Sequence, residues 1–222
     1  MTTSPVTTAT ATCAPIIVWG IGTSRTLRVH WLAHELQLEY ATRPVRPRTG
    51  ETQTPEYLAM SSKGKIPVLQ HGALVVTESA AIIGYLSEAF APKNGFFVPA
   101  NPSERAVLND WCYSVMTELD AHPLYIMRRH EALAEIYGAV PEAVASAREY
   151  FLRMANALSE RMDGDKAYLF GDELSIADIL LVTTLSWAHS YGLPLSDKFS
   201  RYRERACARQ AFQTALQLND SQ

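Results

Sequence analysis

Two neighbouring stretches of this sequence could together hold a small peptide by its backbone. Residues 65–69, Lys-Ile-Pro-Val-Leu, indicate a short strand that carries a proline, and Glu78-Ser79 follows at the head of an apolar helix. Because proline lacks a ladder donor, we expect Pro67 at a sheet edge or in a cis peptide bond. A cis Ile66-Pro67 bond would turn the Ile66 amide and carbonyl outward. Ser79 at a helix N-terminus would attract a carboxylate through unpaired N–H groups and the helix dipole.

The elements that must position these groups can be read from the apolar spacing and the turn residues. A tight turn at His71-Gly72 makes residues 65–77 a hairpin, and the apolar run after it predicts a helix from Ser79 to Phe90. Upstream, the pattern predicts a strand over residues 16–18, a helix over 24–36, a strand over 41–45 and a short helix from Pro55. Strands and helices therefore alternate ahead of the hairpin.

The second half of the chain is predicted to be helical. Asn101-Pro102-Ser103-Glu104 is typical of a helix start, and this helix is expected to kink or end near Pro123. Another helix is expected from Pro141 to about Gly164. Ser175 and Asp178 have the spacing of a capping box, with a structural role, ahead of an almost wholly apolar helix that should form the domain core.

The order and separation of four segments resemble the cytosolic glutathione transferase family over nearly the whole chain. The segments are residues 16–19, 24–36, 64–69 and 77–82. The threonine- and alanine-rich composition of residues 1–15 indicates a disordered tail, and the resemblance implies a thioredoxin-like glutathione-binding domain over 16–90. That domain would have βαβαββα order and a mixed four-stranded sheet with a cis-proline. A linker over 91–101 and an all-helical bundle over 102–222 would follow.

The same resemblance assigns the hairpin and helix start to glutathione. Ile66 would pair through its backbone with the cysteinyl unit, and Pro67 would hold that geometry. Glu78 would accept from the γ-glutamyl ammonium, and Ser79 would donate to its carboxylate. Lys65 would reach the glycyl carboxylate or nearby backbone, with a solvated loop lysine as the alternative.

Activation of glutathione requires a donor to its thiolate near the start of the first helix. Lowering a thiol pKa from near 8.5 by about 2 units takes about 2.7 kcal/mol, which a hydroxyl hydrogen bond and a helix dipole together approach. Neither tyrosine nor cysteine lies between Trp19 and Arg28, which leaves three hydroxyls: Thr23, Ser24 and Thr26. Ser24, four residues before Arg28, matches the serine-type members. Thr23 and Thr26 are alternatives, and capping alone would explain all three. Arg28 is expected to hold an ion pair at the domain interface.

The second substrate is expected to be a small apolar electrophile bound between the two domains. Its wall would be drawn from the helix that begins at Asn101. The candidates are Asn109, Trp111, Cys112, Tyr113 and Met116. Arg128-Arg129, with His122 and His130, could favour an anionic co-substrate, but a solvated helix face is the preferred interpretation.

Composition excludes several other classes of function. The net charge of −3 over 222 residues gives no basic footprint for nucleic acid, and no apolar run approaches the roughly 20 residues of a membrane span. The threonine- and alanine-rich start lacks the features of a secretory signal. Cys13, Cys112 and Cys207 are far apart, so neither a metal site nor a disulfide framework is expected, and a reducing cytoplasmic setting follows.

The resemblance thus implies a cytoplasmic, homodimeric glutathione transferase, needing no metal, that serves detoxification by joining the glutathione thiolate to apolar electrophiles. One alternative is a glutathione-dependent isomerase or dehalogenase on the same fold. Another is a non-catalytic binding or dimerisation module, which the three rival hydroxyls keep open.

Overall fold

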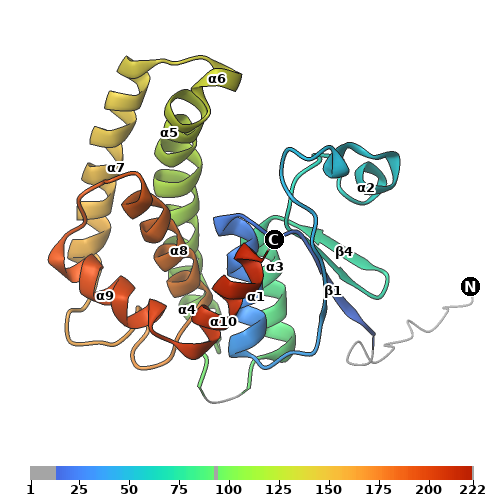
Figure 1. Ribbon diagram of the computed structural model, residues 1–222. Coiled ribbons are helices and arrows are strands. Elements are labelled where there is room, and N and C mark those ends of the chain that lie inside the picture. Colours follow the sequence, from blue (N-terminus) through green and yellow to red (C-terminus); the bar gives the residue numbers. More distant parts are fainter. Residues whose placement is uncertain (1–13, 93–94, 222) are drawn as a thin grey trace, which may run out of the picture.

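The computed structural model describes residues 14–92 and 95–221, which form a half with a β-sheet and a helical half (Figure 1). Residues 1–13 of the expected tail, and Cys13 with them, lie outside the described residues, as do residues 93 and 94 of the expected linker. No helix in the described ranges is both long and apolar enough to cross a membrane.

The sheet has four strands in the order β2-β1-β3-β4, with both parallel and antiparallel neighbours. Strand β1 (Ile16–Trp19) pairs in parallel with β2 (Ala41–Arg43) and antiparallel with β3 (Val68–His71), which continues through the expected turn into β4 (Leu74–Thr77). The predicted mixed sheet is therefore confirmed.

Alternating side chains of the sheet face two layers of helix. Val18 and Leu69, which are paired in the β1–β3 register, pack with α1 (Ser24–Glu35) and α3 (Ser79–Phe90). Val68 points the other way and packs with Tyr57 of α2 (Pro55–Met60), which follows the short 3₁₀ helix η2 (Glu51–Gln53). Figure 1 shows α1 and α3 side by side against the sheet, with α2 apart from them.

Pro67 is accommodated by a cis peptide bond, one of the two arrangements that the sequence predicted for it. The Ile66–Pro67 bond is cis, and β3 begins only at Val68. Strand β3 pairs with β1 on one side and β4 on the other, so the edge-strand alternative was wrong.

The helical half follows one long, irregular path before it folds back. Helix α4 (Pro102–Ser114) continues as the π-helix η3 (Val115–Leu124), whose wider turns include Pro123, so the expected end of the helix near that proline was wrong. The remaining elements, in chain order, are α5 (Tyr125–Met127), the π-helical η4 (Arg128–Ala132), α6 (Ala134–Tyr137), α7 (Pro141–Arg161), α8 (Ile176–Ser190), α9 (Asp197–Cys207) and α10 (Gln210–Asp220).

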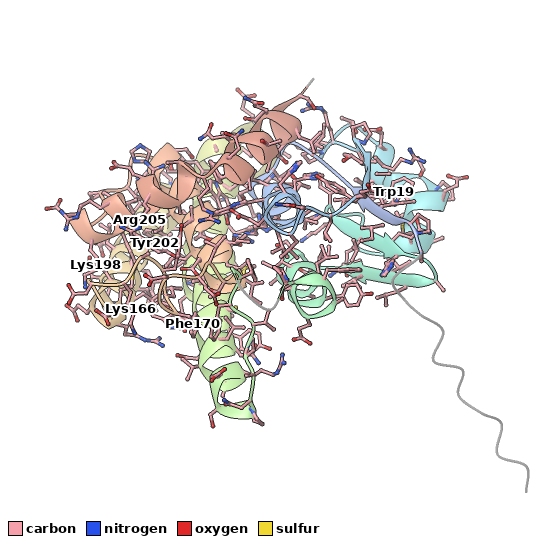
Figure 2. The ribbon with its side chains drawn as sticks, turned by 90° about the horizontal axis from the view of Figure 1, so that it is seen from below. Trp19, Lys166, Phe170, Lys198, Tyr202 and Arg205 are labelled. Carbon is pink, nitrogen blue, oxygen red and sulfur yellow. The ribbon has the colours of Figure 1, made fainter. Side chains whose placement is uncertain are left out.

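The capping box at the start of α8 is present as predicted. Asp178 accepts from the Ser175 amide at 2.8 Å and from its hydroxyl, and the Ser175 hydroxyl accepts from the Asp178 amide. The Asp178 carboxylate also accepts from the Leu169 amide at 2.9 Å and the Tyr202 hydroxyl at 2.6 Å. Figure 2 shows Tyr202 among the side chains of the helical half, far from Trp19 in the sheet half. The capping box thus connects the start of α8 to the loop at Leu169 and to Tyr202 of α9.

Helix α10 returns to the sheet half and packs along α1. The Phe212 ring meets the edge of Trp31 at a centroid distance of 5.0 Å, and Arg209 forms an ion pair with Glu35. The end of α10 therefore lies beside the start of α1, where the candidate hydroxyls are.

Candidate functional site

A cavity of about 900 Å³ lies between the two halves of the molecule. The sheet half contributes Ser24, Ile66 and Ser79, and the helical half contributes Met116, Tyr125 and Trp187. These residues come from separate elements, so the cavity exists only where the two halves meet.

All five residues predicted to bind glutathione line this cavity. They are Lys65, Ile66, Pro67, Glu78 and Ser79. Of the five electrophile-site candidates, Met116 lines the cavity. Trp111 and Cys112 are buried in the core, Asn109 is half-buried and Tyr113 is 64% exposed, and none of these four is a lining residue. The reason is that α4 packs against neighbouring helices, and the chain reaches the cavity only in η3.

The three hydroxyls at the start of α1 have different surroundings. Thr23 caps the helix: its hydroxyl accepts from the Thr26 amide at 3.0 Å. Thr26 is fully buried, and its hydroxyl lies 2.8 Å from the Thr23 carbonyl and 2.6 Å from Asn219 Oδ1. Ser24 is the first residue of the helix, is half-buried in the cavity wall, and forms no side-chain hydrogen bond with the described chain. Its hydroxyl is therefore available to a ligand.

The loop that carries Ile66 is held by the residue before it. The Lys65 carbonyl accepts from the Tyr57 hydroxyl at 3.0 Å and the Ser61 hydroxyl at 3.3 Å. Burial raises the pKa of Tyr57 to about 12, so its phenol remains a donor. The Ile66 amide and carbonyl make no hydrogen bond with the described residues, and Ile66 is one of the residues that line the cavity.

Glu78 and Ser79 meet the cavity at the N-terminus of α3. Glu78 has φ +71°, a left-handed conformation that side-chain-bearing residues seldom adopt and that is found most often at functional sites. Its carboxylate forms an ion pair with Lys63. Ser79 is the first residue of α3, and its oxygen accepts from Arg28 at 3.2 Å, so its O–H can still donate.

Arg28 joins the two halves behind the cavity. Its guanidinium, with no exposed surface, pairs with Asp120 at 2.7 Å and donates to Thr183 and Thr184 at 2.9 Å each. This confirms the expected ion pair at the domain interface. Because the same group also donates to Ser79, it fixes the hydroxyl of the proposed carboxylate site.

The cavity includes residues that sequence reasoning did not single out. Arg25 pairs with Asp120, and its guanidinium lies over the rings of Tyr125 and Trp187 at 5.0 and 5.2 Å. The position of Arg25 directly after Ser24 was a usable signal. Asp120, Tyr125 and Trp187 belong to helices of the other domain, and no local motif marks them. Within the described residues, no group of three or more His, Cys, Asp or Glu could hold a metal ion.

Comparison with known proteins assigns both halves to one family. Residues 14–88 match the model of the glutathione S-transferase N-terminal domain, and residues 141–205 match that of the C-terminal domain. The chain is 30% identical over 188 residues to a maleylacetoacetate isomerase of Pseudomonas aeruginosa, covering 82% of this chain and 86% of that protein. It is 32% identical over 155 residues to glutathione S-transferase 1 of Dianthus caryophyllus, covering 69% and 68%.

A solved structure with glutathione bound shares the architecture. The theta class glutathione S-transferase of Xanthomonas axonopodis pv. citri superposes with a TM-score of 0.73 at 25% identity, covering 91% of this chain and 97% of that one. With the two domain models and the relatives above, this shows that the chain belongs to the glutathione S-transferase family.

Proposed function

We propose that the protein is a glutathione transferase in which Ser24 activates the glutathione thiol. The observation that carries this is the free Ser24 hydroxyl at the N-terminus of α1, in a cavity shared with Ile66, Glu78 and Ser79. Segments far apart in sequence thus present a thiolate donor, an unpaired peptide backbone and a carboxylate site to one space.

Each group has a role that fits one part of the peptide. The Ile66 backbone pairs with the cysteinyl unit, Glu78 accepts from the γ-glutamyl ammonium, and Ser79 donates to the adjacent carboxylate. Glu78 must share its carboxylate between that ammonium and Lys63, with which it is paired. Lys65, which lies in the same loop, serves the glycyl carboxylate.

Ser24 stabilises the thiolate in two ways. Its hydroxyl donates to the sulfur, and its place in the first turn brings the sulfur near the unpaired N–H groups and positive end of α1. Bringing the thiol to the electrophile and lowering its pKa are the two contributions to rate, and the thiolate displaces a leaving group or adds to an electrophilic carbon.

An ultraviolet difference titration with glutathione at neutral pH, combined with Ser24→Ala, tests this proposal. The unmodified protein should bind glutathione saturably and show a thiolate band. Ser24→Ala should lose the band and about a hundredfold in turnover while it still binds glutathione. Ser62→Ala, an exposed serine that does not line the cavity, is the matched control and should behave as the unmodified protein. Full turnover in Ser24→Ala would remove Ser24 from the mechanism, and failure to bind glutathione would refute the function.

A glutathione-dependent isomerase is the second candidate. The relative from Pseudomonas aeruginosa that is named a maleylacetoacetate isomerase favours it. In an isomerase the thiol is regenerated in each turnover, whereas a transferase consumes it. Counting free thiol during turnover separates the two, because only conjugation lowers the thiol concentration in step with product.

We also propose a cytoplasmic homodimer. Exposed apolar side chains on β4 and α4 support a second copy as partner: Leu74 is 41%, Val107 51% and Tyr113 64% exposed. The free thiols of Cys112 and Cys207 suit a reducing compartment. Sedimentation should give a particle of twice the 24.6 kDa chain mass, and a 24.6 kDa particle at micromolar concentration would contradict the dimer.

A further inference from the structure

The ring of Tyr125 lies among three cationic side chains at the helical side of the cavity. The guanidinium of Arg25 is 5.0 Å from the ring centroid, and Lys65 Nζ and the Arg128 guanidinium are each 5.6 Å from it. The three come from α1, the loop before β3 and η4, and all of them line the cavity. The helical side of the cavity therefore carries positive charge, whereas the sequence analysis expected an apolar electrophile there.

Three carboxylate residues line the cavity, Asp120, Glu78 and Asp220, and none of the ion pairs among the described residues joins them to Lys65 or Arg128. Asp120 is fully buried and is shared by Arg25 and Arg28, so one negative charge faces two positive ones. Glu78 is paired with Lys63. Lys65 is exposed, but Arg25 and Arg128 are half-buried, and because burial weakens screening by solvent these two attract an anion more strongly than they would on an open surface.

Glutathione accounts for only part of this charge. Its γ-glutamyl carboxylate is assigned to Ser79 and its glycyl carboxylate to Lys65. Neither carboxylate of glutathione is then assigned to Arg25 or Arg128. Arg25 uses one guanidinium nitrogen for Asp120, its guanidinium lies over the rings of Tyr125 and Trp187, and its side chain is 22% exposed. A guanidinium has five donors, so Arg25 can bind a second carboxylate without releasing Asp120.

Resting on the proposed function, we propose that the co-substrate is an anionic electrophile whose carboxylate is bound by Arg25 and Arg128. The reactive carbon of such a molecule extends toward Ser24, the residue next to Arg25. The contrast between neighbours supports the assignment, since Arg128 lines the cavity whereas Arg129 is exposed and lies over Tyr137 at 4.5 Å.

A matched pair of electrophiles tests the proposal. In 4-(chloromethyl)benzoate and its methyl ester, the glutathione thiolate forms a C–S bond at the methylene carbon and chloride leaves with the C–Cl electron pair. The carboxylate is remote from the reacting carbon, so dividing each kcat/KM by the uncatalysed rate constant isolates recognition of charge. The unmodified protein should favour the carboxylate about tenfold or more. Arg128→Gln should lower kcat/KM about tenfold for the carboxylate alone, and Arg129→Gln should leave both values unchanged.

Equal use of the acid and the ester would overturn the proposal. So would an Arg128→Gln variant that slows both substrates equally and raises the KM for glutathione, because Arg128 would then be serving glutathione.

Binding of an unreactive probe separates this inference from the proposed function. Calorimetry with 4-methylbenzoate and its methyl ester, on protein saturated with glutathione, reports charge recognition without any chemistry. Tighter binding of the acid, lost in Arg128→Gln and kept in Arg129→Gln, supports the proposal even if neither chloride is turned over. No preference for the acid overturns it while the transferase activity can still stand, and failure to bind glutathione refutes the proposed function itself.

Discussion

The Thr26 hydroxyl donates to Asn219 Oδ1 over 2.6 Å, joining two residues that are 193 positions apart. The Gly22 amide also donates to Asn219, to its backbone carbonyl at 2.9 Å and to its Oδ1 at 3.2 Å. Asn219 is nearly fully buried at the end of α10. The last helix therefore fixes both sides of the turn that presents Ser24.

Asn219→Ala should loosen that turn. Loss of the buried Oδ1 acceptor removes the bond from the Thr26 hydroxyl, while the Gly22 amide keeps the Asn219 backbone carbonyl, so the free energy of unfolding should fall by about 1 kcal/mol. Turnover with glutathione should fall as well, since Ser24 loses its fixed position. Urea unfolding and steady-state kinetics measure the two effects. Gln217→Ala, on the exposed face of the same helix, is the control, and equal losses in both variants would contradict the prediction.

Asp178→Ala should lower the free energy of unfolding by far more than the loss of an ordinary helix cap does. Its buried carboxylate accepts from Leu169, Tyr202 and two groups of Ser175. Removal leaves these donors unpaired, so we expect a loss of about 3 kcal/mol or more in guanidinium unfolding. Asn101→Ala removes the exposed cap of α4 and should cost about 1 kcal/mol. A similar loss in the two variants would show that the added bonds of Asp178 contribute little.

Arg28→Met should weaken the contact between the two halves of the molecule and lower the free energy of unfolding. The substitution keeps most of the side-chain length but leaves Thr183 and Thr184 without their donor and Asp120 with Arg25 alone. Breaking a buried ion pair on one side costs about 3–5 kcal/mol when the remaining charge has no partner, and because Asp120 keeps Arg25 we expect a loss of about 3 kcal/mol. Arg105→Met breaks an exposed pair with Glu88 and should cost less than about 1 kcal/mol. Thermal and urea unfolding of both proteins provide the comparison, and a small loss for Arg28→Met would refute the interface role.

The stability of the protein should depend on pH through His30. Burial lowers the pKa of His30 below its ordinary 6.5, with the neutral ring donating from Nε2 to the Gly20 carbonyl and accepting at Nδ1 from Tyr40. The unfolded chain therefore binds a proton near pH 6.5 that the folded chain does not. Stability is complete above that pH and falls as the pH drops below it.

Urea unfolding between about pH 7 and about pH 5 measures this dependence. His30→Gln should show a shallower loss of stability toward acid than the unmodified protein, although its stability at neutral pH will be lower. His189→Gln, at an exposed position, should keep the original slope. Parallel curves for His30→Gln and the unmodified protein would mean that another group binds the proton.

Local patterns predicted most of the fold because each of them is satisfied by near neighbours. The expected bounds of α3 match the structure, and so do the turn after His71 and the Ser175–Asp178 box. Pro123 was misleading because its effect on a helix depends on whether the backbone can widen into π turns, and packing against α7 and α8 decides that. The choice between a cis bond and an edge position for Pro67 likewise depended on the pairing partners of β3.

The candidate site was predictable only on the glutathione side. Lys65, Glu78 and Ser79 lie in motifs with fixed spacing, and they do line the cavity. The opposite wall depends on how the helical half rotates against the sheet half. For that reason, Met116 is the one predicted electrophile-site residue that lines the cavity. The sequence did not indicate Tyr125 or Trp187. Arg25 has a local signal beside Ser24, but its contacts with Tyr125 and Trp187 form only where the two halves meet.

The π-helix η3 sets which way the chain beyond it faces. Successive residues of an α-helix are rotated by about 100° about its axis, whereas a π turn contains an additional residue. Asp120 lies within η3, and Tyr125 and Arg128 follow it. Deleting one residue from η3 would restore tighter winding and turn Tyr125 and Arg128 away from Arg25, with every charged residue still present in the sequence. Backbone register, as well as residue identity, therefore specifies the charge of this cavity.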